Sequence, residues 1–289
     1  MVVCLCAAFS LLSASCGKSK SPIVVGSGIG TDQLVVAEIV AQHIQNRLHR
    51  DVRRRSGIGG EQLVYQALET GEITIAPEYT GSIETAILRE TPSSDPSIVL
   101  ARVRGEMLRV GQLELLDPLG YDNPPAMVVL TADAERANAK TLSQAAAGTF
   151  RWKIALSYEF QQRMDSLPAL NSYKLPLEQA QQGMEAAKLF PALQHGDVTM
   201  ISSSLSDGHL LSPGFTVLAD DRHAFAPYQA CLLVREDALA EDPQLRTVLH
   251  ELSGKFNNAL IRKLDAEVEL GHKQPADVAA QFLSEAGLK

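Results

Sequence analysis

Apolar residues recur in two alternating patterns along this chain of 289 residues. Short unbroken runs, such as 23–25 and 230–234, are typical of strands that are buried on both faces. Between the runs, apolar positions three and four residues apart predict amphipathic helices, the first of them opening with Thr31 as its N-cap. Strands that alternate with helices over the whole chain predict an α/β protein with parallel sheets.

The junction over residues 73–82 is the most informative of these alternations. A short apolar strand is expected to stop at Pro77, and Tyr79, Thr80 and Gly81 follow at the mouth of the next helix. Where the carboxyl end of a strand meets the amino terminus of a helix, free backbone N–H groups converge and small ligands bind. Junctions of this kind are also common without any ligand, so both interpretations stand at this point.

Two proline-containing stretches indicate where the chain crosses between two lobes. Residues 121–125 include Pro124, and prolines hold the backbone extended. Residues 220–228 include Pro227 and lead the chain back. A cleft between two lobes favours closure around a ligand. The predicted lobes are residues 23–122 together with 226–289, and residues 123–225.

Composition excludes nucleic acid as the expected partner. The formal net charge is −8, whereas nucleic-acid binders usually present a basic face. The only dense basic run, residues 47–55, falls at an expected helix end, where cations suit the helix dipole. With 45% hydrophobic residues the chain can bury a sizeable core.

Residues 1–15 have the character of an export signal, since they carry no charge, are rich in apolar residues and are too short to span a bilayer. Residues 12–16 resemble a bacterial lipoprotein processing site, which makes Cys16 the expected lipidated residue, at the head of a tether over 16–22. Cys231 lies in an apolar run and is expected to be a buried structural cysteine. No spaced set of Cys and His points to a metal or a cofactor.

Eight short motifs follow one another in a fixed order over about 210 residues. They are VGS at 25–27 with TDQ at 31–33, GG at 59–60, PEYTG at 77–81, LDPLG at 116–120, EF at 159–160 with Arg163, SDG at 206–208, PY at 227–228 and LVRED at 233–237. Together they resemble the substrate-binding proteins of ABC importers for osmoprotectants such as glycine betaine, choline and carnitine. The resemblance implies a two-lobed periplasmic-binding-protein fold of type II, a monomer that is not an enzyme, and a permease in the membrane as partner.

The resemblance also implies a binding site for a quaternary ammonium group. Such a group has no N–H donors, so it is held by cation–π attraction and apolar contact inside an aromatic box. Tyr79 and Tyr228 then form two walls of the box, and Thr80, Ser82 and Arg163 face the anionic end of the ligand. The alternative for Arg163 is an ordinary ion pair, for example with Asp165.

Three positions of the expected site depart from the family pattern. Gly28 stands where the family has a lysine, and Pro125 and Ser204 stand where it has tyrosines. The pocket is therefore expected to be roomier and more polar, with Asn123, Ser203 and Ser204 as hydrogen-bond partners. A bulkier betaine or amine fits this pattern better than glycine betaine, and an ergothioneine-like ligand is one example.

Two further functions stay open from the sequence. The first is an enzyme on the same two-lobed fold, such as a deaminase-type transferase, for which residues 206–209 supply Ser, Asp and His. Adjacent side chains do not make a triad, so a loop histidine is the better interpretation of His209. The second is a sensor lipoprotein with altered ligand specificity.

Overall fold

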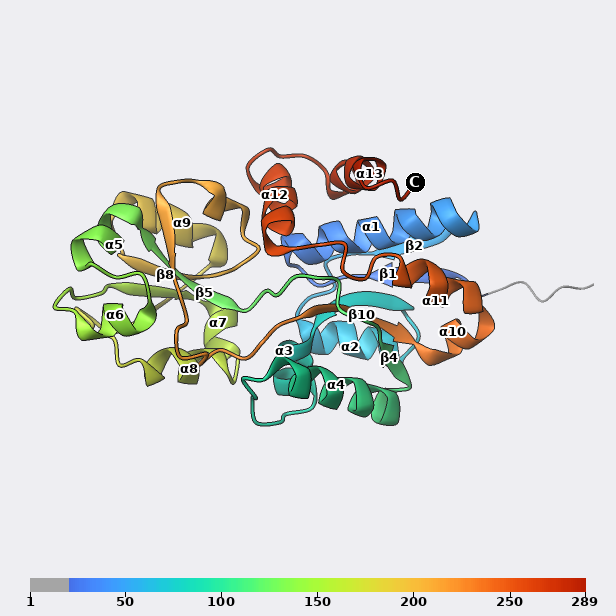
Figure 1. Cartoon of the computed structure of the whole chain (residues 1–289), viewed down its shortest axis with the longest axis horizontal. Coiled ribbons are helices and arrows are strands. Elements are labelled where there is room, and N and C mark those ends of the chain that lie inside the picture. Colours follow the sequence, from blue (N-terminus) through green and yellow to red (C-terminus); the bar gives the residue numbers. More distant parts are fainter. Residues whose placement is uncertain (1–20) are drawn as a thin grey trace, which may run out of the picture.

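The computed structural model describes residues 21–289. The chain forms two lobes, each built on a five-stranded sheet with helices packed on its faces (Figure 1). The α/β class and the two-lobed architecture predicted from the sequence are confirmed. The expected export signal, Cys16 and most of the tether lie outside the described residues.

The first sheet has the strand order β2-β1-β3-β10-β4. Strands β1, β2 and β3 are parallel, and β10 lies antiparallel between β3 and β4. The strands are β1 (Ile23–Gly26), β2 (Val52–Arg55), β3 (Ile75–Tyr79), β4 (Leu113–Leu115) and β10 (Ala230–Arg235). The helical elements of this lobe are α1 (Thr31–Leu48), α2 (Glu61–Glu69), α3 (Thr80–Ser82), η1 (Ile83–Ile87), α4 (Pro96–Gly111), α10 (Glu236–Glu241), α11 (Pro243–His250), α12 (Asn258–Glu269) and α13 (Pro275–Glu285).

The second sheet has the strand order β7-β6-β8-β5-β9. Strand β6 is parallel to β7 and β8, whereas β5 is antiparallel to both β8 and β9. The strands are β5 (Pro125–Leu130), β6 (Ile154–Ser157), β7 (Gln182–Met184), β8 (Met200–Ser204) and β9 (Phe215–Leu218). The helical elements are α5 (Thr131–Ala137), α6 (Leu142–Ala147), α7 (Tyr158–Gln162), α8 (Ser166–Ser172), α9 (Ala186–His195) and η2 (Gly208–Leu211).

Both sheets are mixed, which corrects the prediction of purely parallel layers. The antiparallel strands β5 and β10 are the two that begin directly after the chain has crossed from the other lobe (Figure 1). A chain that arrives from the cleft side enters the sheet in the opposite direction to strands that run toward the cleft. The alternation of strands and helices could not reveal this direction.

The two crossings run side by side and antiparallel. Asp122 and Gln229 form a bridge, and the Asn123 N–H donates to the Tyr228 carbonyl over 3.0 Å. The Tyr228 N–H in turn donates to the Asp122 carboxylate over 2.5 Å. The lobes are therefore joined by a short two-stranded connection that sets Asn123 and Tyr228 at the cleft.

Strand β3 continues through Pro77 and ends at Tyr79, so the prediction that the proline stops the strand is wrong. Only Ile75 pairs with β1, and from Ala76 onward β3 is paired on its β10 side alone. The Pro77 carbonyl accepts from the Gln33 side chain at 3.4 Å, on the side that β1 has left. In a strand the N and the carbonyl of one residue face the same side, so the nitrogen of Pro77 also faces away from β10. Its lack of a hydrogen therefore removes no hydrogen bond between the strands.

Two smaller sequence predictions also change. The N-cap of α1 is Gly30, and Thr31 is the first helical residue. The amphipathic segment over 178–193 is helical only from Ala186, after the short strand β7. Cys231 is buried, as predicted, and burial raises the pKa of its thiol to about 12.

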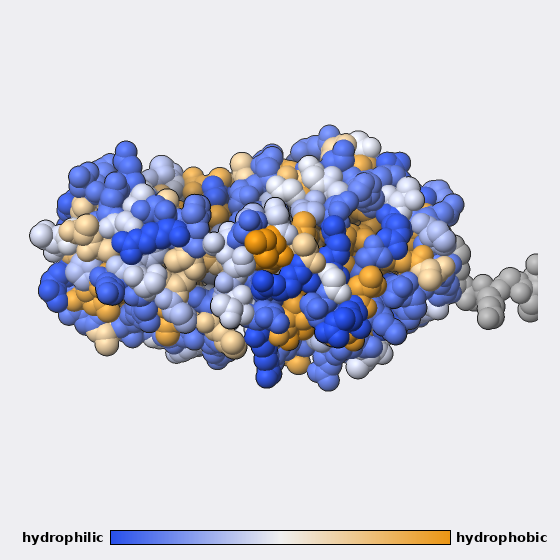
Figure 2. All heavy atoms as spheres, turned by 60° about the horizontal axis from the view of Figure 1, so that its bottom comes forward, coloured by the Kyte–Doolittle hydropathy of each residue, from blue (hydrophilic) through white to orange (hydrophobic). Residues whose placement is uncertain are grey.

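Each lobe has its own hydrophobic cores on the two faces of its sheet. Helix α1 packs against α11, α12 and α13, and its amino terminus lies at the cleft. Figure 2 shows one face of the molecule, on which hydrophobic residues reach the surface in small separate groups among hydrophilic ones. Between residues 21 and 289, no helix combines the length and the apolar character that a membrane span requires.

Candidate functional site

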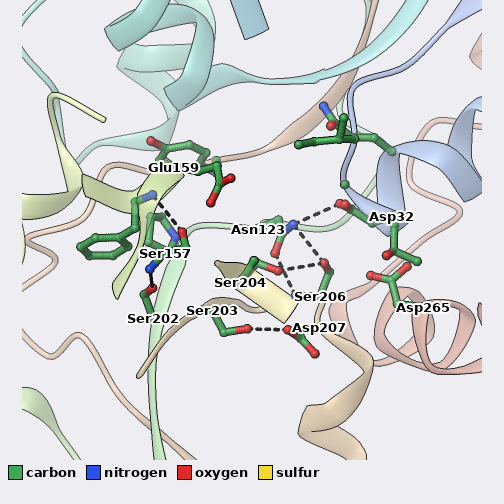
Figure 3. Close-up of a pocket in the computed structure, with 18 of the residues that line it drawn as sticks. Asp32, Asn123, Ser157, Glu159, Ser202, Ser203, Ser204, Ser206, Asp207 and Asp265 are labelled. Carbon is green, nitrogen blue, oxygen red and sulfur yellow. Dashed lines mark hydrogen bonds between the residues drawn. The ribbon is translucent and has the colours of Figure 1, made fainter. Parts of the chain in front are cut away.

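A cavity of about 390 Å³ lies between the two lobes, at the carboxyl ends of strands from both sheets (Figure 3). Two kinds of polar group dominate its wall. Carboxylates come from both lobes: Asp32, Glu61, Glu159, Asp207, Asp265 and Glu269. Serine hydroxyls come from the second lobe: Ser157, Ser202, Ser203, Ser204 and Ser206.

Asp32, in the first turn of α1, is the centre of a buried hydrogen-bond cluster. Its Oδ2 accepts from the hydroxyl of Tyr79, from the hydroxyl of Tyr121 at 3.3 Å and from the Asn123 amide nitrogen at 3.0 Å. Burial raises the pKa of Asp32, and these hydrogen bonds offset part of the rise. The end of β3 and the first crossing are thus tied to the amino terminus of α1.

Asn123 connects the two lobes through its side-chain amide. Its nitrogen donates to Asp32 and also to the Ser206 hydroxyl at 3.1 Å, and its oxygen accepts from the Ser206 N–H at 2.8 Å (Figure 3). Asn123 was predicted to bond the ligand, but its amide is already engaged with protein groups. The Ser204 hydroxyl makes one contact, with the Ser206 hydroxyl at 3.3 Å, and keeps further capacity.

Asp265, on α12, is a buried carboxylate of the cavity wall that a hydrogen bond with Ser206 compensates only in part. Its side chain is only 1% exposed, and its Oδ1 has no hydrogen-bond partner. Burial and the charges of Asp32 and Glu269 raise the pKa of Asp265 to about 10. In Figure 3 its carboxyl group lies beside Asp32 on the wall of the first lobe. A buried acceptor without a donor reduces the stability of the fold, so a hydrogen bond from a ligand to this atom would be favourable.

Arg163, just after α7, joins the lobes on the opposite side of the cavity. Its Nη1 donates to Glu61 at 3.0 Å, and its Nη2 donates to Ser82 at 3.0 Å and to the Tyr228 hydroxyl. Its Nε lies 3.6 Å from an oxygen of Asp165, within ion-pair range. Both terminal nitrogens that were expected to bind the ligand therefore bond the protein itself.

The two predicted box aromatics lie side by side, with Tyr79 bonded to Asp32 and Tyr228 bonded to Arg163. The ring centroids of Tyr79 and Tyr228 are 6.4 Å apart at 49°. The Arg163 guanidinium lies over the Tyr228 ring, 4.6 Å from its centroid, and the Tyr228 hydroxyl donates to Asp165. One face of Tyr228 thus already carries a cation from the protein.

Three predicted ligand residues are not among those that line the cavity: Gly28, Thr80 and Ser82. The Thr80 hydroxyl accepts from the Gln229 N–H at 3.1 Å and so fixes the return crossing. Ser82 is held between Arg163 and Glu61. At Gly28, a Cβ atom would lie 2.3 Å from Oε1 of Gln33, so the Gln33 side chain would have to shift to admit a longer side chain there.

Comparison with known proteins agrees with this architecture. Residues 21–285 match the family described as the substrate binding domain of ABC-type glycine betaine transport systems. The chain belongs to this family. A crystal structure of a glycine betaine/carnitine/choline ABC transporter superposes with a TM-score of 0.83 over 92% of this chain and 99% of that one, at 21% identity. Apo YehZ from Escherichia coli gives a TM-score of 0.73 over 93% of this chain and all of that one (100%), at 24% identity.

Curated relatives in the family carry different ligand names. A glycine-betaine-binding protein of Pseudomonas aeruginosa is 27% identical over 292 residues, which cover 97% of this chain and 93% of that protein. An ergothioneine transport permease/ergothioneine binding protein of Helicobacter pylori is 24% identical over 275 residues. That match covers 93% of this chain but only 48% of the relative, so the chain spans about half the length of that protein.

Sequence reasoning missed the acidic residues that line the cavity. Asp32 lies within the TDQ motif at 31–33, but the motif alone gave no role to its carboxylate. Asp265 and Glu269 lie in α12, where acids on a helix look the same whether they face solvent or a cavity. Phe160 and Phe190 add apolar wall from the second lobe. Only folding brings α12 against the loop that follows β8.

That loop, residues 205–209, docks onto α12. The Leu205 carbonyl accepts from Arg262 at 2.9 Å, and the Gly208 N–H donates to Glu269 at 2.8 Å. The His209 ring bonds Asp207 at 2.9 Å. The interaction with Asp207, and to a smaller extent that with Glu269, raises the pKa of His209 to about 9.

The same loop carries the residues considered for an enzyme. The Ser206 hydroxyl bonds Asn123 and Ser204, whereas the His209 ring bonds Asp207 and stacks on Phe190 with centroids 4.3 Å apart. Within residues 206–209 as the structure describes them, no serine–histidine pair forms. Ligand atoms of Asp207, His209 and Glu269 all lie within 4.8 Å of one another, a spacing that a metal ion could use, but His209 with a raised pKa already supplies a positive charge between the two acids.

Proposed function

We propose that this chain is the solute-binding component of an ABC importer, which captures a betaine-like or quaternary-ammonium small molecule between its lobes and delivers it to a permease in the membrane. The observation that carries the proposal is the cavity between two lobes that are linked by paired crossings. Family membership supports it, and the Helicobacter pylori relative is named as both permease and binding protein.

The proposed lobes are residues 23–122 with 226–289, and residues 123–225. Ligand entry requires these lobes to separate and close again, and the contacts of Arg163 and of loop 205–209 are those that closure must make. Tyr79, Tyr228, Arg163 and Ser204 border the cavity and remain proposed binding-site residues.

Export and anchoring follow from the same proposal. A receptor of this kind works outside the cytoplasmic membrane, and lipidation of Cys16 would hold it near the permease. A monomer is part of the proposal, and on the face drawn in Figure 2 hydrophobic residues form only small separate groups, whereas broad apolar patches usually mark interfaces. Mass spectrometry of membrane-extracted protein tests the lipid on Cys16.

Binding without turnover distinguishes a receptor from an enzyme on the same fold. We expect at least one of glycine betaine, carnitine, choline and ergothioneine to raise the unfolding temperature of the purified protein. A ligand at about 100 times its dissociation constant adds roughly 2.7 kcal/mol to the free energy of unfolding. Nuclear magnetic resonance of the recovered ligand should find it unchanged. A chemically altered ligand would favour the transferase, and no shift with any compound would favour a sensor that has lost this specificity.

A further inference from the structure

The cavity wall carries more ligand acceptors than ligand donors, since six carboxylates and one guanidinium line it. Among the described residues that line it, Arg163 is the only cationic side chain, and both terminal nitrogens of Arg163 bond Glu61, Ser82 and Tyr228. The Arg163 Nε has no hydrogen-bond partner, but it lies 3.6 Å from an oxygen of Asp165, which offsets the charge of the guanidinium. An anionic end of a ligand would therefore have to compete with groups that already hold this guanidinium.

On the opposite wall, the described residues that line the cavity include no cationic side chain, and the charge of His209 lies behind the wall, between Asp207 and Glu269. Asp265 has an unpartnered Oδ1, and the Ser204 and Ser206 hydroxyls lie nearby on the second lobe (Figure 3). Glu78 also has unpartnered carboxylate oxygens, but Glu78 is not among the residues that line the cavity. Asp265 is thus the buried acceptor that a bound molecule can reach.

We propose that the ligand presents N–H donors, on a protonated amine, a guanidinium or a ring nitrogen, to Asp265 and the adjacent serine hydroxyls. This inference rests on the proposed receptor function and specifies its ligand class. A ligand whose only nitrogen is fully methylated leaves the Asp265 oxygen without a donor, and a buried unpaired acceptor costs free energy. Methylated nitrogens elsewhere in the ligand are compatible with the proposal.

The groups around Asp265 link ligand binding to the release of a proton from its carboxyl group. The charged and titratable groups that face Asp265 are Asp32 on α1, Glu269 on its own helix, Asp207 after β8 and the Tyr121 hydroxyl. These acids and burial raise the pKa of Asp265, so the empty site holds a proton at neutral pH. A cationic N–H donor favours the ionised carboxylate, and its binding releases that proton.

Isothermal titration calorimetry at pH 7.5 tests the proposal with two comparisons. Ethanolamine and choline share one skeleton, and only ethanolamine keeps N–H donors. Ergothioneine and glycine betaine are both trimethylated betaines, and only ergothioneine carries a ring N–H. We expect the N–H-bearing member of each pair to bind about tenfold or more tightly, which corresponds to one hydrogen bond to a charged group. Repeating the ethanolamine titration in two buffers of different ionisation enthalpy should show proton release.

The variant Asp265→Asn should lose that tenfold preference, because an amide cannot ionise and so cannot become the charged acceptor that an N–H donor favours. The matched control is Asp237→Asn, which removes an exposed acid on α10 that is paired with Arg235, away from the cavity. The control should leave both affinities unchanged. Thermal unfolding of Asp265→Asn verifies that the variant is folded.

The outcomes test the ligand class, the role of Asp265 and the receptor function separately. Tighter binding of choline and glycine betaine than of their N–H-bearing partners would overturn the inference and leave the receptor function intact. An unchanged preference in folded Asp265→Asn would overturn the role of Asp265. Binding of none of the four compounds, nor of carnitine, would overturn the proposed function and the inference with it.

Discussion

The two sides of the cavity differ in how their charges are balanced. On one side, Arg163 lies between Glu61 and Asp165, bonds Ser82 and covers the Tyr228 ring. On the other side, Asp32 and Asp265 lie close together, and the charges that act most strongly on Asp265 are all acidic. On the first side, the terminal nitrogens of Arg163 are both bonded to protein groups and its Nε, which has no hydrogen-bond partner, faces Asp165. On the second side, the unpartnered atom is a carboxylate oxygen with acidic neighbours.

This difference shows how one cavity can serve two tasks. A charge cluster that satisfies itself stabilises the contact between the lobes, as the Arg163 cluster does. A cluster with an unsatisfied buried acceptor lowers the free energy of unfolding of the protein without ligand. A ligand that donates a hydrogen bond to this acceptor removes the penalty. The sequence analysis named residues on both sides, among them Arg163 and Ser204, but it did not name Asp265, whose oxygen is the unpartnered acceptor of the cavity wall.

Replacing Arg163 by alanine should have the largest effect on stability. Asp165 is 5% exposed and would be left without its cation. Breaking a buried pair costs about 3–5 kcal/mol, and the Arg163 side chain is 26% exposed, so we expect a loss of about 2–4 kcal/mol in urea unfolding. The control is Arg246→Ala, which breaks an exposed pair with Glu114 and should cost at most about 1 kcal/mol. Equal losses would mean that the Arg163 cluster is no stronger than a surface pair.

Gly208→Ala should separate the lobes on the Asp265 side. A Cβ at position 208 would lie 2.5 Å from the backbone of Ala266 and would push the loop away from α12. Overpacking of this kind costs about 1–3 kcal/mol. Thermal unfolding and small-angle scattering should show a less stable and more open molecule. Gly105→Ala, where nothing lies within 4 Å of the new Cβ, should be neutral or slightly stabilising, and a similar loss there would contradict this explanation.

Asp265→Asn should stabilise the empty protein by about 1–2 kcal/mol at pH 8, since it removes a buried carboxyl that is poorly compensated. The folded pKa of Asp265, about 10, lies above the ordinary value of 3.8, so the native state binds a proton that the unfolded chain releases. The stability contributed by that proton is lost as pH rises from 3.8 to 10. The difference in unfolding temperature between variant and wild type should therefore grow from pH 5 to pH 9. A difference that shrinks over this range would assign Asp265 to a structural charge pair.

Tyr228→Phe should have the smallest effect of the four. It removes the hydroxyl that joins Asp165 and Arg163 but keeps the ring under the guanidinium. We expect a loss of about 0.5–1.5 kcal/mol in urea unfolding, the usual net value of a hydrogen bond. The binding preference for N–H-bearing ligands should not change. A changed preference would show that the two sides of the cavity are coupled.

The sequence predicted the fold well because its signals are local and repeated. Apolar runs, helix periodicity and the prolines near residues 124 and 227 are properties of short segments, and they suffice for a two-lobed α/β protein with two crossings. The family resemblance assigned Tyr79 and Tyr228 to the binding site, and both line the cavity. The local signals did not give the direction of β5 and β10, because strand direction depends on where the chain arrives from.

What only the tertiary structure decided is which polar groups are already satisfied. Arg163 and Asn123 have suitable chemistry for a ligand, but neighbours from distant segments bond both terminal nitrogens of Arg163 and the amide of Asn123. Asp265 gives no sign of a role in its helix and becomes a ligand candidate only when α12 meets the cleft. Residue type fixes what a side chain can bond. Hydrogen-bond capacity is shared among residues that are close in space, so only the folded structure shows how much of it remains.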